Sequence, residues 1–233
     1  MPEPLILVPG LGSDAAVWER TVAALGERAD CTIGDTLSDE TLPGMARRIL
    51  AAAPDRFALA GVSMGGMVAL EIVRAAPERV TRLAIVDSNA RPDTPEQAEG
   101  RRRQIVGARA PGDPRARIEA SLAYLIHPDA PADVREAIVA MSLRVGMEAY
   151  ARQSEAVLNR QDQRPILPKV AVPTLVVMGA ADAMIPRDRA EEIAAAIPGA
   201  ELAIIPDCGH LPPIEAPGAL AALLARWLER PAA

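Results

Sequence analysis

The sequence is poor in the residues on which several classes of protein depend. It holds two cysteines in 233 residues, too few for a disulfide framework, which favours a reducing compartment. Its most apolar stretch, 64–73, contains Glu71 and is far shorter than the roughly 18 apolar residues that a membrane span needs. The first residues carry no basic region, so we expect no signal peptide. Together these features predict a soluble cytoplasmic protein with no membrane partner.

Aromatic residues and histidines are scarce as well. One phenylalanine, two tyrosines, two tryptophans and a net charge of −6 provide neither the stacking rings nor the basic face of a nucleic-acid-binding protein. The two histidines, His127 and His210, do not lie at metal-ligand spacing from a cysteine or from each other. We therefore expect no nucleic-acid partner, no metal and no cofactor, and any chemistry must come from ordinary side chains.

What the chain does have is the material for a large core. Half of its residues are hydrophobic, and its length suits one large α/β domain. Short apolar runs alternate with helical patterns, which is typical of a mostly parallel sheet flanked by helices. The predicted strands are 5–8, 31–34 (the weakest), 57–61, 80–87, 174–179 and 201–205, and the predicted helices between and after them are 15–27, 40–52, 65–75, 187–197 and 217–229.

The alternation stops between the fourth and fifth predicted strands. Apolar residues recur there at helical spacing over 118–126, 134–145 and 147–158. We therefore predict a core made of 1–87 and 170–233, with a helical cap over 88–169. Ligands of open α/β sheets bind beyond the carboxyl ends of the strands, where this insertion begins. The alternative is a set of packing helices without a functional role.

The segment Gly61-Val62-Ser63-Met64-Gly65 matches the pattern G-x-S-x-G, with a predicted strand before it and a predicted helix after it. A serine in such a turn is held in a strained conformation with its hydroxyl exposed above the sheet. The two glycines remove side chains that would clash in so sharp a turn. The pattern predicts Ser63 as a nucleophile.

A serine hydroxyl is a weak nucleophile and needs a base, usually a histidine oriented by a carboxylate. His210 lies in the loop between the last predicted strand and the last helix, whereas His127 lies in the predicted cap with no strand end beside it. The position of His127 favours a surface or pocket-lining role. We therefore predict His210 as the base.

Three aspartates compete for the role of the acid. Asp182 follows a predicted strand and gives the chain order Ser, Asp, His that is expected for a strand–turn–helix nucleophile. Asp87 ends the preceding strand and could reach a similar place. Asp207 is three residues from His210 and fits better as a residue that shapes its loop. We predict Asp182 as the acid.

The first predicted strand ends in a glycine-rich turn. Gly10 and Gly12 permit a tight turn there, so that the backbone N–H of Leu11 can point into the site. Together with the N–H of Met64, this would form an oxyanion hole with two donors.

These segments together resemble an α/β-hydrolase-fold serine hydrolase over nearly the whole chain. LILVPGLGSDAAVW is similar to the oxyanion strand and loop of that family, GVSMGGMVALEI to its nucleophile elbow, TLVVMGAADAMIP to its acid strand and IPDCGHLPPIEAP to its histidine loop. ARPDTPEQ resembles small bacterial carboxylesterases related to pimeloyl-acyl-carrier-protein methyl ester esterases and enol-lactonases. The resemblance implies Ser63, Asp182 and His210 as a triad. The family usually has a β-hairpin before the oxyanion strand, whereas this sequence starts at that strand.

We therefore expect a serine esterase that cleaves a small-molecule ester, with a small to medium apolar acyl or alcohol group, through an acyl-enzyme. Enol-lactonase and acyl-carrier methyl esterase activities are alternatives, and a non-catalytic ligand-binding protein is the alternative of another class. The pattern does not reveal the oligomeric state. The predicted substrate-binding residues flank the catalytic loops or belong to the cap: Trp18, Tyr124, Met141, Tyr150, Met184 and Leu211.

Overall fold

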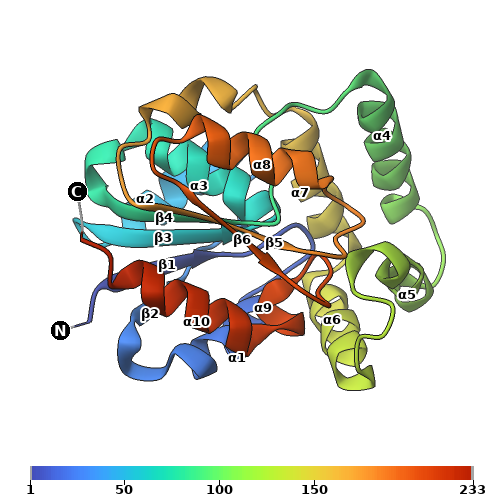
Figure 1. Cartoon of the computed structure of the whole chain (residues 1–233). Coiled ribbons are helices and arrows are strands. Elements are labelled where there is room, and N and C mark those ends of the chain that lie inside the picture. The colour runs from blue at the N-terminus through green and yellow to red at the C-terminus, as the bar shows by residue number, and fades with distance from the viewer. Residues whose placement is uncertain (1, 232–233) are drawn as a thin grey trace.

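The computed structural model describes residues 2–231, and its centre is a sheet of six strands (Figure 1). The strand order is β2-β1-β3-β4-β5-β6, and each neighbouring pair is parallel. The predicted α/β architecture with about six strands is therefore confirmed. The strands are β1 Pro4–Val8, β2 Asp30–Ile33, β3 Phe57–Val62, β4 Val80–Val86, β5 Thr174–Gly179 and β6 Glu201–Ile205.

The inner strands are buried on both faces. Every residue of β3, β4 and β5 is buried, and β1 is buried from Leu5 onward. Strands covered on both faces have near-continuous apolar sequences, which explains why these four were easy to predict. The two edge strands, β2 and β6, are partly exposed and have mixed sequences.

Helices cover both faces of the sheet (Figure 1). One face carries α1 Ala16–Leu25, the short α9 Pro212–Glu215 and α10 Pro217–Leu228, while the other carries α2 Leu42–Ala52, α3 Met64–Ala75 and α8 Arg187–Ala196. Each face forms its own apolar layer with the helices that cover it. Within residues 2–231, no helix combines the length and the apolarity that crossing a membrane requires.

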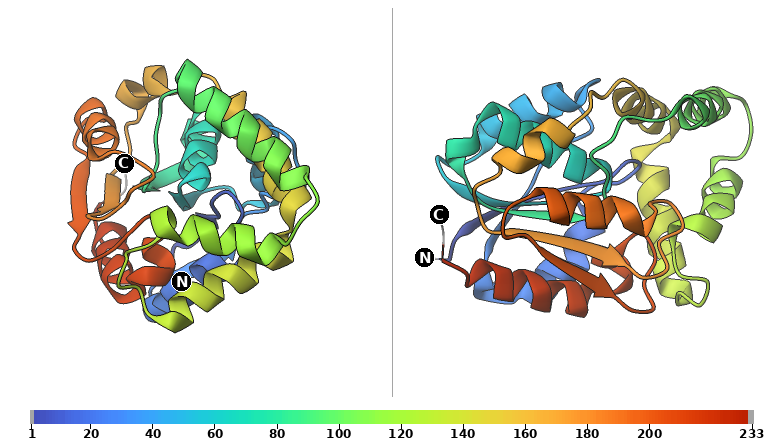
Figure 2. Two further views of the ribbon diagram at one scale, coloured as in Figure 1. Left: turned by 90° about the vertical axis from the view of Figure 1, so that its right-hand side faces the viewer. Right: turned by 45° about the horizontal axis from the view of Figure 1, so that its top comes forward.

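Four helices follow β4 and gather around the carboxyl ends of the strands (Figure 2). They are α4 Pro95–Arg109, α5 Pro114–Leu125, α6 Ala132–Val145 and α7 Met147–Leu158. A 3-10 turn, Arg164–Lys169, then leads to β5. The helical spacings in this region correspond to α5, α6 and α7, although α5 ends one residue before Ile126.

The first of these helices, α4, was not predicted. It buries only Ile105 and Ala108, so its sequence has no apolar stripe. Local interactions stabilise its start instead, because Thr94 and Gln97 form a reciprocal capping box. The helix then packs along α7.

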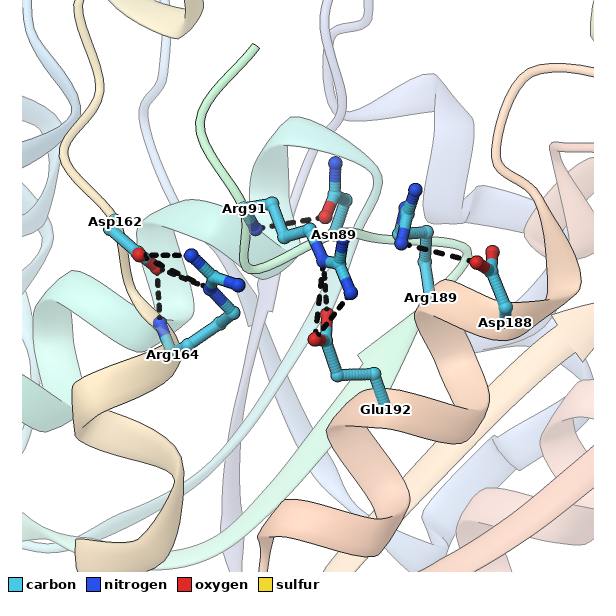
Figure 3. Close-up of polar contacts among 7 residues, drawn as sticks. All are labelled: Asn89, Arg91, Asp162, Arg164, Asp188, Arg189 and Glu192. Atoms are coloured by element: carbon cyan, nitrogen blue, oxygen red, sulfur yellow. Dashed lines mark hydrogen bonds and ion pairs between the residues drawn. The ribbon is translucent and has the colours of Figure 1, made fainter. Parts of the chain in front are cut away.

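The two ends of this helical region meet at one point beside the sheet. The N–H of Gln163 donates to the carbonyl oxygen of Ala90, at 2.9 Å. Next to this contact, Arg91 donates to both carboxylate oxygens of Glu192 on α8, at 2.8 Å each (Figure 3). The carboxylate of Asp162 accepts from the side chain of Arg164 in the returning segment. The region is thus attached to the core where it leaves and re-enters it.

Candidate active site

Ser63 lies in the turn between β3 and α3, with a left-handed φ of 55°. A Cβ added at Gly61 would lie 2.2 Å from the carbonyl oxygen of Gly65, and one added at Gly65 would lie 2.1 Å from that of Val8. Only glycine fits at both positions. The Ser63 N–H donates to the carbonyl oxygen of Val86 at 2.9 Å, which ties the strained turn to the neighbouring strand.

The structure brings the three predicted triad residues together. His210, which is 2% exposed, has its Nε2 atom 2.8 Å from Ser63 Oγ and its Nδ1 atom 2.7 Å from Asp182 Oδ2. An ionised carboxylate only accepts hydrogen bonds, so Nδ1 carries the proton and Nε2 is free to accept from the serine hydroxyl. This is the tautomer that a histidine base requires.

Asp182 is held as a carboxylate by the groups around it. Burial acts to raise its pKa, but the hydrogen bond and the charge of His210 outweigh that effect, so the pKa lies below its ordinary value. The backbone N–H groups of Met184 and Ile185 also donate to its Oδ1 atom, at 2.7 and 3.0 Å. The carboxylate therefore stays ionised and oriented toward His210.

The competing residues have other positions. Asp87 is buried beside Asp182 and is not bonded to His210, and Asp207 is exposed in a turn with a φ of 50°. The ring of His127 accepts from the N–H of Asp129 through Nδ1, at 3.1 Å, and the residue does not line the cavity described below.

Glu215 was not predicted, although it organises the loop that carries His210. Its carboxylate accepts from the N–H groups on either side of the histidine, Gly209 at 3.0 Å and Leu211 at 2.9 Å. It also accepts from the N–H of His127 at 2.8 Å, which joins the loop to the inserted helices. A glutamate five residues after the histidine, in a proline-rich turn, is the sequence signal that could have indicated it.

The predicted oxyanion residues border the same cavity as Ser63 and His210. Met64 is the first residue of α3, so its N–H has no acceptor within the helix. Leu11 lies between Gly10 and Gly12, and Gly12 has a φ of 71°. These positions are compatible with two N–H donors next to the serine.

Gln153, on α7, is a second residue that the sequence did not indicate. Its Oε1 atom accepts from the N–H of Gly12 at 2.8 Å, and its Nε2 atom donates to the carbonyl oxygen of Thr36 at 3.1 Å. The side chain is 1% exposed. A residue of the inserted helices thus fixes the glycine turn that carries Leu11. Because the partners are 141 residues apart, the sequence gives no local signal for this contact.

Above Ser63 lies a cavity of about 290 Å³, with mostly apolar walls and no acidic residue in its lining. Five of the six predicted substrate-binding residues line it. They are Tyr124, Met141, Tyr150, Met184 and Leu211.

The sixth predicted substrate-binding residue, Trp18, does not line the cavity. It is fully buried on the apolar face of α1, together with Val17, Thr21 and Leu25. Its expected place in the pocket is therefore corrected to a place in the core, because Trp18 belongs to the buried apolar face of α1.

Comparison with known proteins agrees with this architecture. The model of the alpha/beta hydrolase family matches residues 5–223. The chain therefore belongs to the alpha/beta hydrolase family, which confirms the predicted fold and family.

The relatives of the chain include esterases. The pimeloyl-acyl-carrier protein methyl ester esterase of Aromatoleum aromaticum is 29% identical, over 94% of this chain and 96% of that protein. A thermophilic esterase from Thermogutta terrifontis superimposes with a TM-score of 0.88 at 30% identity, over 99% of this chain and 90% of that one. The enol-lactonase from Burkholderia xenovorans LB400 gives a TM-score of 0.83 at 26% identity, over 98% and 92%. The chain is thus an α/β hydrolase with esterase relatives, as predicted.

Proposed function

We propose that this protein hydrolyses carboxylic esters through an acyl-enzyme, with Ser63 as nucleophile, His210 as base and Asp182 as the acid that orients the base. The proposal rests on one observation, the continuous chain of hydrogen bonds from Asp182 through His210 to Ser63, at 2.7 and 2.8 Å. A base within hydrogen-bond reach of the hydroxyl, itself oriented by a carboxylate, is the arrangement that activates a serine.

In the proposed reaction, His210 Nε2 takes the proton of Ser63 as Oγ attacks the ester carbonyl. The N–H groups of Leu11 and Met64 stabilise the negative charge on the carbonyl oxygen. The imidazolium then gives its proton to the departing alcohol, which leaves Ser63 acylated. Water, deprotonated by the same nitrogen, releases the acid and restores the serine. Asp182 holds the ring in place and stabilises its charged form throughout.

We further propose that residues 88–169 form a cap over a core of 1–87 and 170–233. Tyr124, Met141 and Tyr150 come from the helices of this region and line the cavity above Ser63. A cap of this kind excludes water from the substrate and limits its size.

The cavity supports a substrate with a small to medium apolar group. Its volume of about 290 Å³ is at the lower end of the usual range for small-molecule sites, and its walls are mainly apolar. The names of the relatives keep two narrower activities open, hydrolysis of an acyl-carrier methyl ester and of an enol-lactone. A protein that binds such compounds without turnover is the alternative of another class.

The first test is the variant Ser63→Ala, with p-nitrophenyl butyrate as substrate. We expect the wild type to give a burst of nitrophenol followed by steady turnover, and the variant to lose the burst and at least about 10³-fold in kcat. Ser38→Ala is the matched control, since Ser38 is exposed and does not line the cavity. A burst that persists in Ser63→Ala would overturn the assignment, and binding without turnover in the wild type would favour the non-catalytic alternative.

A panel of substrates tests the acyl group. p-Nitrophenyl esters from acetate to palmitate, a methyl ester and an enol-lactone should be compared by kcat/KM. We expect short and medium chains to be preferred over palmitate, because the cavity cannot enclose a long chain. A higher kcat/KM for palmitate would contradict this expectation.

A further inference from the structure

Asp87 lies at the carboxyl end of β4 in a conformation that its residue type rarely adopts. It is 1% exposed and has a left-handed φ of 42°. Two backbone contacts fix it there: its N–H donates to the carbonyl oxygen of Val177 at 2.9 Å, and its Oδ1 atom accepts from the N–H of Gly179 at 2.9 Å. A strained residue held in this way beside a reactive site indicates a functional constraint.

The carboxyl group of Asp87 lies close to that of Asp182. One oxygen of each carboxyl group and a ring nitrogen of His210 all lie within 4.8 Å of one another. Two buried carboxyl groups this close together do not both ionise, because their charges repel in a medium of low polarity. One of them must carry a proton.

The hydrogen bonds around the pair decide which one does. Asp182 accepts from His210 and from the N–H groups of Met184 and Ile185. Asp87 accepts only from Gly179, and within residues 2–231 no donor reaches its Oδ2 atom. An oxygen that accepts from nothing can still donate if it is protonated. The charge therefore belongs to Asp182 and the proton to Asp87.

The other titratable groups nearby favour the same assignment. Burial, followed by the charge of Asp182, raises the pKa of Asp87 well above its ordinary value, and Glu215 acts in the same direction. Burial also raises the pKa of the neighbouring Cys208 thiol, which leaves it neutral. The carboxylate of Glu215 already accepts from the backbone N–H groups of Gly209 and Leu211 in the histidine loop and from that of His127.

We propose that Asp87 is a positioning residue: a neutral carboxylic acid whose Oδ2–H donates to Asp182 and holds that carboxylate in line with His210. The role rests on the proposed function, since it acts on the reaction only through Asp182 and His210. It adds a fourth member to the chain of hydrogen bonds, which then runs from Asp87 to Asp182, His210 and Ser63.

The test on activity compares Asp87→Asn with Asp87→Ala. The amide of asparagine keeps a neutral donor for Asp182 and an acceptor for Gly179, so we expect kcat within about threefold of wild type. Alanine removes both hydrogen bonds, so kcat should fall about ten- to a hundredfold with little change in KM. Equal activity of wild type and Asp87→Ala would overturn the proposal.

The pH profile separates a neutral Asp87 from an ionised one. If Asp87 is neutral, Asp87→Asn removes no charge, and the acid limb of kcat/KM should stay within about 0.3 pH unit of wild type. If Asp87 were an ionised second acid, the variant would remove a negative charge beside the imidazolium. The limb would then move to lower pH by about one unit or more, which would overturn the proposal.

Thermal unfolding provides a readout that does not depend on turnover. If the Asp87 carboxyl group is neutral in the folded protein, it can ionise only in the unfolded protein once the pH exceeds the ordinary pKa of aspartate. The wild type therefore loses stability as pH rises above that value. Asp87→Asn lacks this loss, so its Tm relative to wild type should rise as pH increases above about 5, by up to about 3–5 °C per pH unit. A flat or falling difference would contradict the proposal, even if no ester substrate is found.

Asp93→Asn is the matched control for this measurement. Asp93 is also buried, but it pairs with Arg101 at 2.6 Å and Arg160 at 2.8 Å. Burial acts to raise its pKa, and these two arginines outweigh the effect and lower it. The stability that Asp93 contributes is fully present above the ordinary pKa of aspartate and is lost only at lower pH, so the Tm of Asp93→Asn relative to wild type should stay constant where that of Asp87→Asn rises.

Discussion

At the scale of single residues, the backbone around His210 depends on Glu215. Three buried or partly buried N–H groups donate to this one carboxylate, two of them directly adjacent to the histidine. A hydrogen bond to a charged group contributes about 1.5–3 kcal/mol, and an orphaned buried donor has a comparable cost. The position of the imidazole relative to Ser63 is therefore sensitive to a residue that touches neither of them.

We expect Glu215→Ala to lower kcat by at least about tenfold with a smaller change in KM, because the loop loses three hydrogen bonds while the cavity walls remain. Glu215→Gln keeps one accepting oxygen and should retain intermediate activity. Steady-state kinetics on p-nitrophenyl butyrate is the measurement, and Glu229→Ala, at the end of α10, is the control. A wild-type kcat in Glu215→Ala would contradict this role.

Glycine 65 is required by the close packing of α3 against β1. A Cβ at this position would lie 2.1 Å from the carbonyl oxygen of Val8, so backbone would have to move. We expect Gly65→Ala to lower the free energy of unfolding by at least about 2 kcal/mol. At Gly218, in the first turn of α10, a Cβ meets nothing within 4 Å, and Gly218→Ala should be neutral or stabilising by up to about 1 kcal/mol. Urea unfolding of both variants tests this difference. An equal change in the free energy of unfolding in Gly65→Ala and Gly218→Ala would contradict it.

At the scale of elements, α7 and the turn after β1 act as one unit through Gln153. Gln153→Met keeps a long side chain and removes both hydrogen bonds, which leaves the N–H of Gly12 buried without its acceptor. We expect the free energy of unfolding to fall by about 1–3 kcal/mol, and kcat to fall more than KM rises, because Leu11 belongs to the same turn.

The control for Gln153→Met is Gln161→Met, since Gln161 is exposed and pairs with Arg74 at 3.1 Å. Urea unfolding and esterase kinetics on both variants give the comparison. An unchanged kcat in Gln153→Met would show that the turn holds its shape without α7.

The elements that could be predicted from the sequence are those whose burial produces either a continuous apolar run or apolar residues at helical spacing. The inner strands are apolar along their whole length, and α5, α6 and α7 have apolar residues at helical spacing. By contrast, α4 buries two side chains and is stabilised by a capping box and by α7, so periodicity could not reveal it. Trp18 is close in sequence to the oxyanion turn but lies on the buried face of its own helix, so its sequence position alone places it wrongly in the pocket.

The residues of the candidate site also fall into those that the sequence could predict and those that it could not. Ser63, Asp182 and His210 each follow a predicted strand, and parallel strands deliver their carboxyl ends to one edge of the sheet, so their meeting could be predicted. Gln153 accepts from a backbone N–H 141 residues away, for which the sequence has no local signal, whereas the spacing of Glu215 from His210 is a weak signal for its role. The neutral state of Asp87 depends on which donors surround two adjacent carboxyl groups, and only three-dimensional contacts show that.

At the scale of the whole molecule, the chain combines a rigid sheet with a set of helices that supplies much of the cavity wall. The sheet and its covering helices hold Ser63, Asp182 and His210, while α4 to α7 contribute Tyr124, Met141 and others to the lining. Polar links at Gln153, Glu215 and Arg91 connect the two parts. Changes in the inserted helices can therefore reach the reacting groups through these contacts as well as through the cavity shape.

The contact between Gln163 and Ala90 has an evolutionary consequence. Because the polypeptide leaves the sheet and returns to it at the same place, the pairing of β4 with β5 does not depend on how many residues lie between them. Descendants of one ancestral gene can lengthen, shorten or replace this excursion while inheriting the same reactive edge. A change in the length of this excursion can therefore alter the cavity while the strand ends that carry the reacting groups stay in place.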